Sequence, residues 1–295
     1  MTMGDPHVLC LGDVMTDILA SLSTDLAIHS DTPATTRLFG GGSAANTASW
    51  LAAEGVRTAM IARVGADAFG RAAGRELTEA GVQVEFAIDG DRATGSCVVL
   101  VHPDGERTMI PDPGANAALS PEDVPPGLFI AGRHLHLSAY SLFHGAGDAA
   151  AAALALARAA SMTITVDAAS AAPLAAYGAE RFANAVGGGL VVLANIDEAV
   201  VLAGTPDASE AARHLGRHFG GAVIKLGAEG SVYSDGDEVT HAPAVPIELL
   251  DSTGAGDAFA AGLIRELIMG APVEEFLRAG NELAARACAR LGSRP

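Results

Sequence analysis

The sequence predicts an α/β protein with three layers, α/β/α, built on a mostly parallel central sheet with a small β flap at its edge. Short apolar runs of strand length alternate with small-residue segments of helical character along most of the 295 residues. This alternation is typical of parallel sheets, because a helix has to return the chain before the next strand begins. Two stretches, 18–39 and 97–111, break the rhythm and look like extended segments joined by turns.

The individual elements follow from apolar runs bounded by turn residues. We expect strands at 8–11, 58–64, 134–137, 162–166, 190–194 and 222–226, and helices at about 44–52, 68–80, 147–160 and 209–219. In the flap, Pro103-Asp104-Gly105 stands between two apolar runs, which predicts a β-hairpin turn. No internal repeat, linker or second boundary is visible, so we expect one domain over 1–295 with flap segments around 18–39 and 97–111.

Composition and charge restrict the partners. The chain is 49% hydrophobic and 18% charged, and 18 basic against 35 acidic residues give a net charge of −17. Phosphate contacts need clustered Lys and Arg, so nucleic acid is not expected as a partner. No apolar run is long enough to span a bilayer, no charged-then-apolar leader begins the chain, and its three cysteines have no paired spacing. We expect a soluble, reduced, cytoplasmic protein that does not bind membranes.

The most informative segment is Asp251-Ser252-Thr253-Gly254-Ala255-Gly256-Asp257, where a turn opens into a small-residue helix. Small residues let backbone N–H groups converge on one point, and the helix N-terminus adds a positive field, so the turn suits a phosphoryl group in transfer. Asp257, on the first helical turn, can accept a proton from an attacking hydroxyl. An ordinary glycine-rich helix start is the alternative, but the two aspartates and the small-residue helix favour catalysis.

Two segments nearer the N-terminus are candidates for substrate binding. Asp13 and Asp17 follow the first predicted strand, and open α/β sheets bind ligands at the carboxyl ends of their strands. A carboxylate there can accept hydrogen bonds from a polyol, although an Asp-rich turn that caps a helix gives the same pattern. Residues 40–46 also fit the loose dinucleotide pattern G-x-G-x-x-A, but no convincing strand precedes them and no well-placed acidic residue follows.

Residues 251–257 resemble the C-terminal signature D-[ST]-[TV]-G-A-G-D of the ribokinase-like (PfkB) family of sugar and nucleoside kinases, at all seven positions. Residues 41–46 are similar to its N-terminal signature G-G-x-x-x-N, and further motifs follow in the family's order as far as Gly292. The resemblance implies a ribokinase-like fold in which the flap forms a lid over the sugar. It also implies ATP as the phosphoryl donor and Mg²⁺ as the metal.

The resemblance suggests a role for each matching residue. It implies Asp257 as the catalytic base, with an anion hole formed by the amides at Gly254, Ala255 and Gly256. Substrate binding is expected from Asp13, Asp17, Gly41, Gly42, Asn46, Arg107 and Tyr140. Cofactor binding is expected from Asn195, Lys225, Gly227, Gly230 and Asn281, with Glu198 of an N-x-x-E motif organising Mg²⁺ largely through water. Some ribokinases bind K⁺ near the residues that match Asp251, Thr253, Ala287, Arg290 and Gly292, which extends the expectation to a monovalent cation.

The acceptor stays open at this point. We expect a hydroxymethyl oxygen of a small sugar that is ribose-, fructose- or 2-keto-3-deoxygluconate-like. Ribose itself is disfavoured, because Tyr140 stands near the place of a sugar-binding glutamate of ribokinases proper, and the lysine usual in their N-terminal signature is missing. The alternative is an adenosine- or pseudouridine-like nucleoside, whose base needs an aromatic shelf such as Phe39, Tyr140 or Phe143.

Other functions remain as alternatives to a kinase. The chain could be a catalytically silent sugar-binding regulator, although an intact Asp257 and glycine turn argue against it. A nicotinamide-dependent oxidoreductase rests only on the loose glycine match. His134 and His136 share one face of a predicted strand, but no third metal ligand accompanies them. An exposed lid edge would also permit a homodimer.

Overall fold

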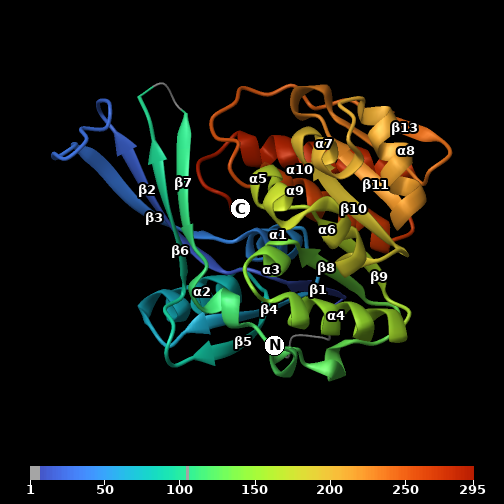
Figure 1. Cartoon of the computed structure of the whole chain (residues 1–295), viewed down its shortest axis with the longest axis horizontal. Helices are drawn as coiled ribbons and strands as arrows, with labels where there is room; N and C mark the ends of the chain where they lie inside the picture. The colour runs from blue at the N-terminus through green and yellow to red at the C-terminus, as the bar shows by residue number, and fades with distance from the viewer. Residues whose placement is uncertain (1–6, 104–105) are drawn as a thin grey trace.

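The computed structural model describes residues 7–103 and 106–295, which form two separate sheets with helices around the larger one (Figure 1). The strands of the larger sheet lie in the order β13-β12-β11-β10-β9-β8-β1-β4-β5. Their bounds are β1 Val8–Leu11, β4 Thr58–Gly65, β5 Gln83–Asp89, β8 His134–Ser138, β9 Thr163–Asp167, β10 Leu190–Asn195, β11 Gly220–Lys225, β12 Ser231–Ser234 and β13 Val239–Ala242. From β5 to β11 neighbouring strands run parallel, and β12 and β13 complete one edge antiparallel.

Helices cover both faces of the large sheet, so its strands are buried on two sides. Side chains alternate along β1: Leu9 and Leu11 join one apolar cluster, and Val8 and Cys10 join the other. The first cluster includes residues of α4 Gly147–Ala159, α5 Ala171–Tyr177, α6 Ala179–Val186, α7 Ile196–Ala203 and α8 Ala208–Phe219. The second includes residues of α1 Ser43–Ala53, α2 Ala68–Glu79, α9 Ala255–Ile268 and α10 Val273–Cys288. This is the predicted three-layer α/β/α fold.

A four-stranded small sheet stands beside the main body, at the left of Figure 1. Its order is β3-β2-β6-β7, with β2 Met15–Leu22, β3 Ala34–Gly41, β6 Gly95–Val101 and β7 Arg107–Asp112. β2 pairs antiparallel with β3 and parallel with β6, and β6 pairs antiparallel with β7. These strands overlap the two flap ranges, while Asp104 and Gly105 of the expected hairpin turn lie outside the described residues.

The expected elements are present, and most of their ends differ by one or two residues. For example, the strand expected at 162–166 spans Thr163–Asp167, and the helix expected at 68–80 spans Ala68–Glu79. Sequence reasoning did not identify β5, β12 and β13, which lie at the two edges of the large sheet. In the described part of the chain, no helix combines the length and the apolar composition needed to cross a membrane.

Candidate active site

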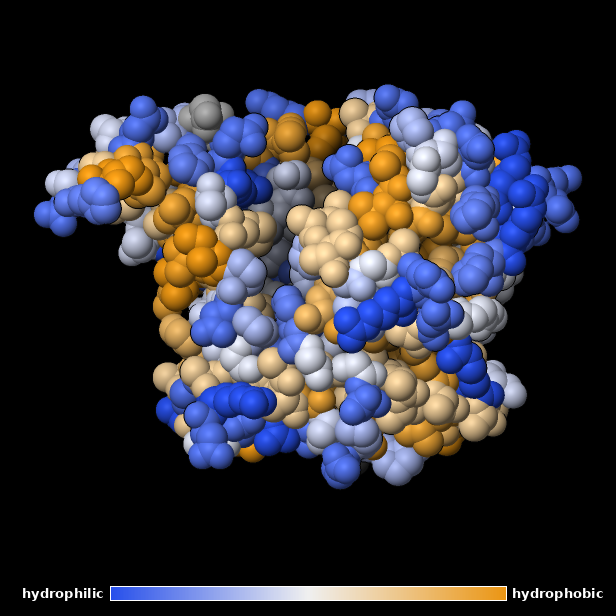
Figure 2. Space-filling view, viewed as in Figure 1, coloured by the Kyte–Doolittle hydropathy of each residue, from blue (hydrophilic) through white to orange (hydrophobic). Residues whose placement is uncertain are grey.

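A pocket of about 750 Å³ lies at the carboxyl ends of the parallel strands, where both sheets contribute to its wall. Figure 2 shows the surface hollowed between the small sheet and the main body. Met15 and Met109 line the pocket from the small sheet, and Asp167 and Lys225 line it from the ends of β9 and β11. Its position is the one at which open α/β sheets bind ligands.

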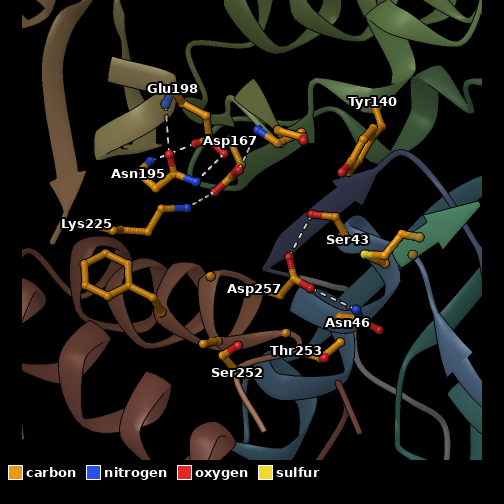
Figure 3. A pocket seen from close by; sticks show the side chains of 18 of the residues that line it. Ser43, Asn46, Tyr140, Asp167, Asn195, Glu198, Lys225, Ser252, Thr253 and Asp257 are labelled. Atoms are coloured by element: carbon orange, nitrogen blue, oxygen red, sulfur yellow. Dashed lines mark hydrogen bonds and ion pairs between the residues drawn. The ribbon is translucent and has the colours of Figure 1, made fainter. Parts of the chain in front are cut away.

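Asp257, on the first turn of α9, is held by two hydrogen bonds inside this pocket (Figure 3). One carboxylate oxygen accepts a hydrogen bond from Ser43 Oγ at 2.8 Å, and the other accepts one from Asn46 Nδ2 at 2.8 Å. Burial raises the pKa of Asp257 to about 7, although the bonds from Asn46 and Ser43 favour the charged form. A carboxyl group with this pKa can serve as a general base near neutral pH.

The start of α1 positions Ser43 and Asn46, which stand three residues apart on one face of the helix. Gly42 precedes the helix with φ 94°, and a Cβ atom there would clash with the carbonyl oxygen of Asp13. The Asp13 carboxylate accepts hydrogen bonds from the amides of Ser43 at 2.9 Å and Ala44 at 3.4 Å. Asp13 therefore caps this helix, the alternative noted for the Asp-rich turn, and it also lines the pocket.

A second layer of contacts orients Asn46. Its Oδ1 accepts hydrogen bonds from Ser293 Oγ at 3.2 Å and Arg294 Nε at 3.1 Å, which leaves Nδ2 directed at Asp257. Burial raises the pKa of Asp17, at the pocket end of β2, to about 6, although the charge of Arg294 acts in the opposite direction. The end of the pocket at β2 and the start of α9 thus holds two carboxyl groups, Asp17 and Asp257, with raised pKa values.

The turn before α9 has the geometry expected of an anion site. Gly254 adopts the left-handed conformation with φ 75°, and a Cβ atom there would lie 2.7 Å from the Ser293 Cα. The Ala255 amide, which the sequence resemblance places in the anion hole, donates instead to the Ser252 carbonyl oxygen at 3.2 Å. The amides that follow it lie on the first helical turn, whose N–H groups have no partner within the helix, so they are the candidates for binding an anion. Lys225 adds positive charge, because its Nζ would lie 3.4 Å from a Cβ atom built on Gly256.

The opposite end of the pocket is formed by the ends of β9, β10 and β11 (Figure 3). Lys225 Nζ forms an ion pair with the Asp167 carboxylate at 2.8 Å. Asn195 and Glu198 form a reciprocal cap of α7: Asn195 Oδ1 accepts from the Glu198 amide at 2.9 Å, and Glu198 Oε2 accepts from the Asn195 amide at 2.7 Å. Burial raises the pKa of Glu198, while the nearby charge of Lys225 opposes that effect.

These residues fit Mg²⁺ bound through water better than direct chelation. Among residues 7–103 and 106–295, no group of three or more His, Cys, Asp or Glu side chains is arranged to hold a metal ion. Asp167 and Glu198 nevertheless both line the pocket, and each carboxylate oxygen has two lone pairs. Mg²⁺ retains several waters when it binds, so carboxylates already in hydrogen bonds can still orient it.

Arg107 reaches from β7 to the turn before α9. Its Nη2 forms an ion pair with Asp251 Oδ1 at 2.7 Å, and its Nη1 donates a hydrogen bond to Thr253 Oγ1 at 2.6 Å. Asp251 also accepts bonds from the amides of Thr253 at 2.7 Å and Gly292 at 3.2 Å. Although burial acts to raise the pKa of Asp251, these bonds and the Arg107 charge hold it below its usual value.

The structure brings most of the predicted site residues to one pocket. The residues that line it are Asp13, Asp17, Gly42, Asn46, Arg107, Tyr140, Asn195, Glu198, Lys225, Gly227, Gly230, Thr253, Gly254, Ala255, Gly256, Asp257 and Asn281. The predicted residues that do not line it are Gly41, Asp251, Ala287, Arg290 and Gly292. Of these, Ala287 is packed in the core, and Arg290 lies 5.8 Å from the centre of the Trp50 ring.

Some polar pocket residues were not assigned roles from the sequence, among them Ser43, Asp167 and His144. Ser43 lies inside the glycine signature, at a position the pattern leaves variable. Asp167 ends β9, so its place directly after an expected strand was a usable signal. His144 stacks on Tyr140 with ring centres 5.3 Å apart, and nothing in the local sequence indicates this.

The histidine pair on β8 has a structural role. Both rings of His134 and His136 are buried and form hydrogen bonds with threonine hydroxyls of β9, Thr163 and Thr165. Burial lowers the pKa of His134 to about 3 and of His136 to about 4, so both are neutral at pH 7.

Comparisons with known proteins agree with this geometry. The model of the pfkB family carbohydrate kinases matches residues 5–295. An ATP-dependent ribose-1-phosphate kinase of Halopiger xanaduensis is 31% identical over 295 residues, covering 98% of this chain and 94% of the relative. A fructokinase of Klebsiella pneumoniae is 29% identical over 236 residues, covering 77% and 76%. The crystal structure of adenosine kinase from Sinorhizobium meliloti is similar with a TM-score of 0.89 at 27% identity, covering 99% and 96%.

Proposed function

The chain belongs to the pfkB family of carbohydrate kinases and is a phosphotransferase with an alcohol group as acceptor, and we propose that it transfers the γ-phosphoryl group of ATP to a hydroxymethyl oxygen of a small sugar. The main support is the pairing of a half-buried Asp257, whose pKa desolvation raises to about 7, with the anion-binding turn directly before it. The same pocket extends to the ends of β9, β10 and β11, which leaves room for the nucleotide.

Asp257 acts as the base in this reaction. Its carboxylate accepts the hydroxyl proton while the acceptor oxygen forms a bond to the γ-phosphorus and the bond to the β–γ bridging oxygen of ATP breaks. Charge then develops on the phosphoryl oxygens, and the amides at Gly254 and Gly256 donate hydrogen bonds to them. The Ala255 amide joins them only by giving up its bond to the Ser252 carbonyl oxygen. Ser43 and Asn46 hold Asp257 in place, because each donates to one of its two oxygens.

The nucleotide end is organised by charged groups. Lys225 lies between Asp167 and the turn at Gly256, where its charge offsets that of the transferring phosphoryl group. Glu198 and Asp167 would orient Mg²⁺ through water, while Asn195, Gly227, Gly230 and Asn281 would border the nucleotide. When bound, Mg²⁺ neutralises phosphate charge.

The acceptor end is formed by both sheets. Asp17, Gly42 and Asn46 orient the sugar hydroxyls, and Asp13 supports them by capping α1. The small sheet is the lid of a single domain spanning residues 1–295, and its closure excludes water that would otherwise accept the phosphoryl group. A homodimer through this sheet stays a prediction.

A nucleoside acceptor is the second candidate, and a specific feature favours it. Tyr140 and His144 stack at 5.3 Å and both line the pocket, with Met15 and Met109 on the small-sheet side. Such a wall suits the flat face of a base attached to ribose. The three relatives above act, by their names, on a sugar phosphate, a sugar and a nucleoside, so they leave this choice to experiment.

The test is acceptor-dependent release of ADP from Mg-ATP, measured with a panel of sugars, keto-sugar acids, sugar phosphates and nucleosides. We expect one acceptor class to support turnover, and Asp257→Asn to reduce it by about two to four orders of magnitude while ATP still binds. A variant with near-normal turnover would remove Asp257 as the base. No turnover with any acceptor, together with saturable sugar binding by calorimetry, would support a silent sugar-binding regulator instead.

A further inference from the structure

The contact between Arg107 and the turn before α9 joins two parts of the fold that are far apart in sequence. Arg107 is the first residue of β7 in the small sheet, whereas Asp251 and Thr253 lie in the main body, just before the anion-binding turn. The guanidinium binds both of them, at 2.7 Å and 2.6 Å. It therefore holds the small sheet against the segment that carries the anion hole.

Asp251 needs a positive partner at this place. Its side chain is only 3% exposed, and its two oxygens accept the amide hydrogens of Thr253 and Gly292. These bonds link the start of the turn to the C-terminal segment, which packs against Gly254. A buried carboxylate without a counter-charge is costly, so the arrangement depends on the cation that faces it.

The sequence resemblance led us to expect a monovalent cation near Asp251 and Thr253. In this structure Asp251 Oδ1 and the Thr253 hydroxyl bind the Arg107 guanidinium, so a cation at these two groups would lie against a like charge. The residues around Asp251 therefore do not fit a bound K⁺ while β7 lies against the turn.

We propose that Arg107 is a positioning residue that supplies, from the small sheet, the positive charge that a monovalent cation would otherwise supply to Asp251. The inference rests on the proposed kinase function. It couples lid closure to catalysis, because the anion-binding turn has its charge partner only when β7 lies against it. When the lid opens, Asp251 loses that partner and the anion-binding turn becomes less ordered. Transfer of the phosphoryl group to water is therefore slow until the lid has closed over an acceptor.

The direct test measures hydrogen exchange of the backbone amides of residues 251–257 and needs no catalytic activity. We expect Arg107→Gln to speed exchange there by about fivefold or more, since the buried carboxylate has lost its counter-charge. Arg37→Gln, at an exposed arginine on the outer strand β3 of the same sheet, is the matched control and should change nothing in this segment. Unchanged exchange in Arg107→Gln would overturn the proposal.

A second test uses steady-state kinetics with and without potassium chloride at constant ionic strength. We expect the wild-type rate to be independent of K⁺, and Arg107→Ala to lower kcat about ten- to hundredfold with little change in the acceptor KM. Added K⁺ or guanidinium at non-denaturing concentration should restore part of the lost kcat.

The role of Arg107 and the kinase activity can be tested separately. A strong K⁺ requirement of the wild type would contradict the proposal. The proposal would also be contradicted if Arg107→Ala raised only the KM for the acceptor and left kcat unchanged. That result would mean that Arg107 binds the acceptor, as the sequence resemblance predicts. If the wild type transfers no phosphoryl group at all, the kinase function fails, while the exchange experiment still decides the role of Arg107.

Discussion

At the scale of single residues, burial and hydrogen bonding shift the pKa of the Asp257 carboxyl group in opposite directions. Burial of Asp257 favours its protonated form, and the two bonds from Ser43 and Asn46 favour its charged form. The result is a pKa of about 7, close to the pH at which a base is most useful. Through its hydrogen bond, Ser43 thus favours the charged form of Asp257.

The pH dependence of turnover should report this balance. Because Asp257 must be ionised to accept a proton, we expect kcat/KM to fall below about pH 7, tenfold per pH unit once the group is mostly protonated. Ser43→Ala removes a bond to the charged form, so the acid limb should move to higher pH by about 0.5–1 unit. Ser49→Ala is the control, since its hydroxyl bonds to the Ala45 carbonyl instead. An acid limb that stays in place in Ser43→Ala would show that this bond does not tune the base.

The same pKa has a consequence for stability. The pKa of Asp257 is 3.8 in the unfolded chain and about 7 in the folded protein, so the folded state binds the additional proton between about pH 4 and pH 7. The group therefore stabilises the fold below about pH 4 relative to neutral pH, and this contribution is lost as pH rises to 7. We expect Asp257→Asn to raise Tm at pH 8 by about 2–6 °C, and to bring little gain at pH 4, by calorimetry. A Tm difference that is equal at the two pH values would contradict this linkage.

At the scale of elements, the start of α7 combines a structural cap with a proposed metal function. Glu198→Gln keeps the length of the side chain and an oxygen for the Asn195 amide, but it removes the negative charge. We expect the Mg²⁺ concentration for half-maximal rate to rise about tenfold or more, because the outer-sphere carboxylate is lost.

The control for this variant is the cap of α8, which lies away from the pocket. Asp207 accepts a bond from the Glu210 amide at 2.8 Å, so Asp207→Ala should cost about 1 kcal/mol of stability and leave the Mg²⁺ response unchanged. An unaltered Mg²⁺ response in Glu198→Gln would limit Glu198 to capping.

The turn into α1 depends on glycine for two reasons that can be separated. Gly42 has φ 94° and also stands against the Asp13 carbonyl, whereas Gly55 has φ 79° and no described heavy atom within 4 Å of a Cβ atom. We expect Gly42→Ala to lower the free energy of unfolding by about 2–4 kcal/mol and Gly55→Ala by only about 1 kcal/mol, measured by urea denaturation. Equal losses would mean that the backbone conformation, not the close contact, dominates at Gly42.

The whole molecule is organised around a pocket whose walls belong to two sheets. β6 and β7 face the main body across this pocket, while β12 and β13 form the far edge of the large sheet. An acceptor bound between the sheets should therefore slow hydrogen exchange in β6 and β7 without changing β13. The measurement is exchange with and without the acceptor that supports turnover. Protection that is equal in β7 and β13 would indicate general stabilisation and not closure.

Much of this architecture could be predicted because its signals are local. Apolar runs located the strands of the parallel core, and the two glycine signatures located the turns before α1 and α9. The edge strands β5 and β13, and β12 next to the edge, were not identified, since strands at the margin of a sheet are less uniformly apolar than central ones. His144 was not assigned a role, because its contact with Tyr140 depends on packing.

The order of residues along the chain was enough to indicate the fold class, the family resemblance and the residue types available for phosphoryl transfer. Short-range rules are enough for these, because a glycine turn at a helix start has the same anion-binding chemistry wherever it occurs. Only the tertiary structure decided that Ser43 and Asn46 hold Asp257, that Lys225 pairs with Asp167, and that Arg107 binds Asp251. These pairs are separated by 58 to 214 residues, and burial and charge at such distances along the chain are set by which surfaces the fold brings together.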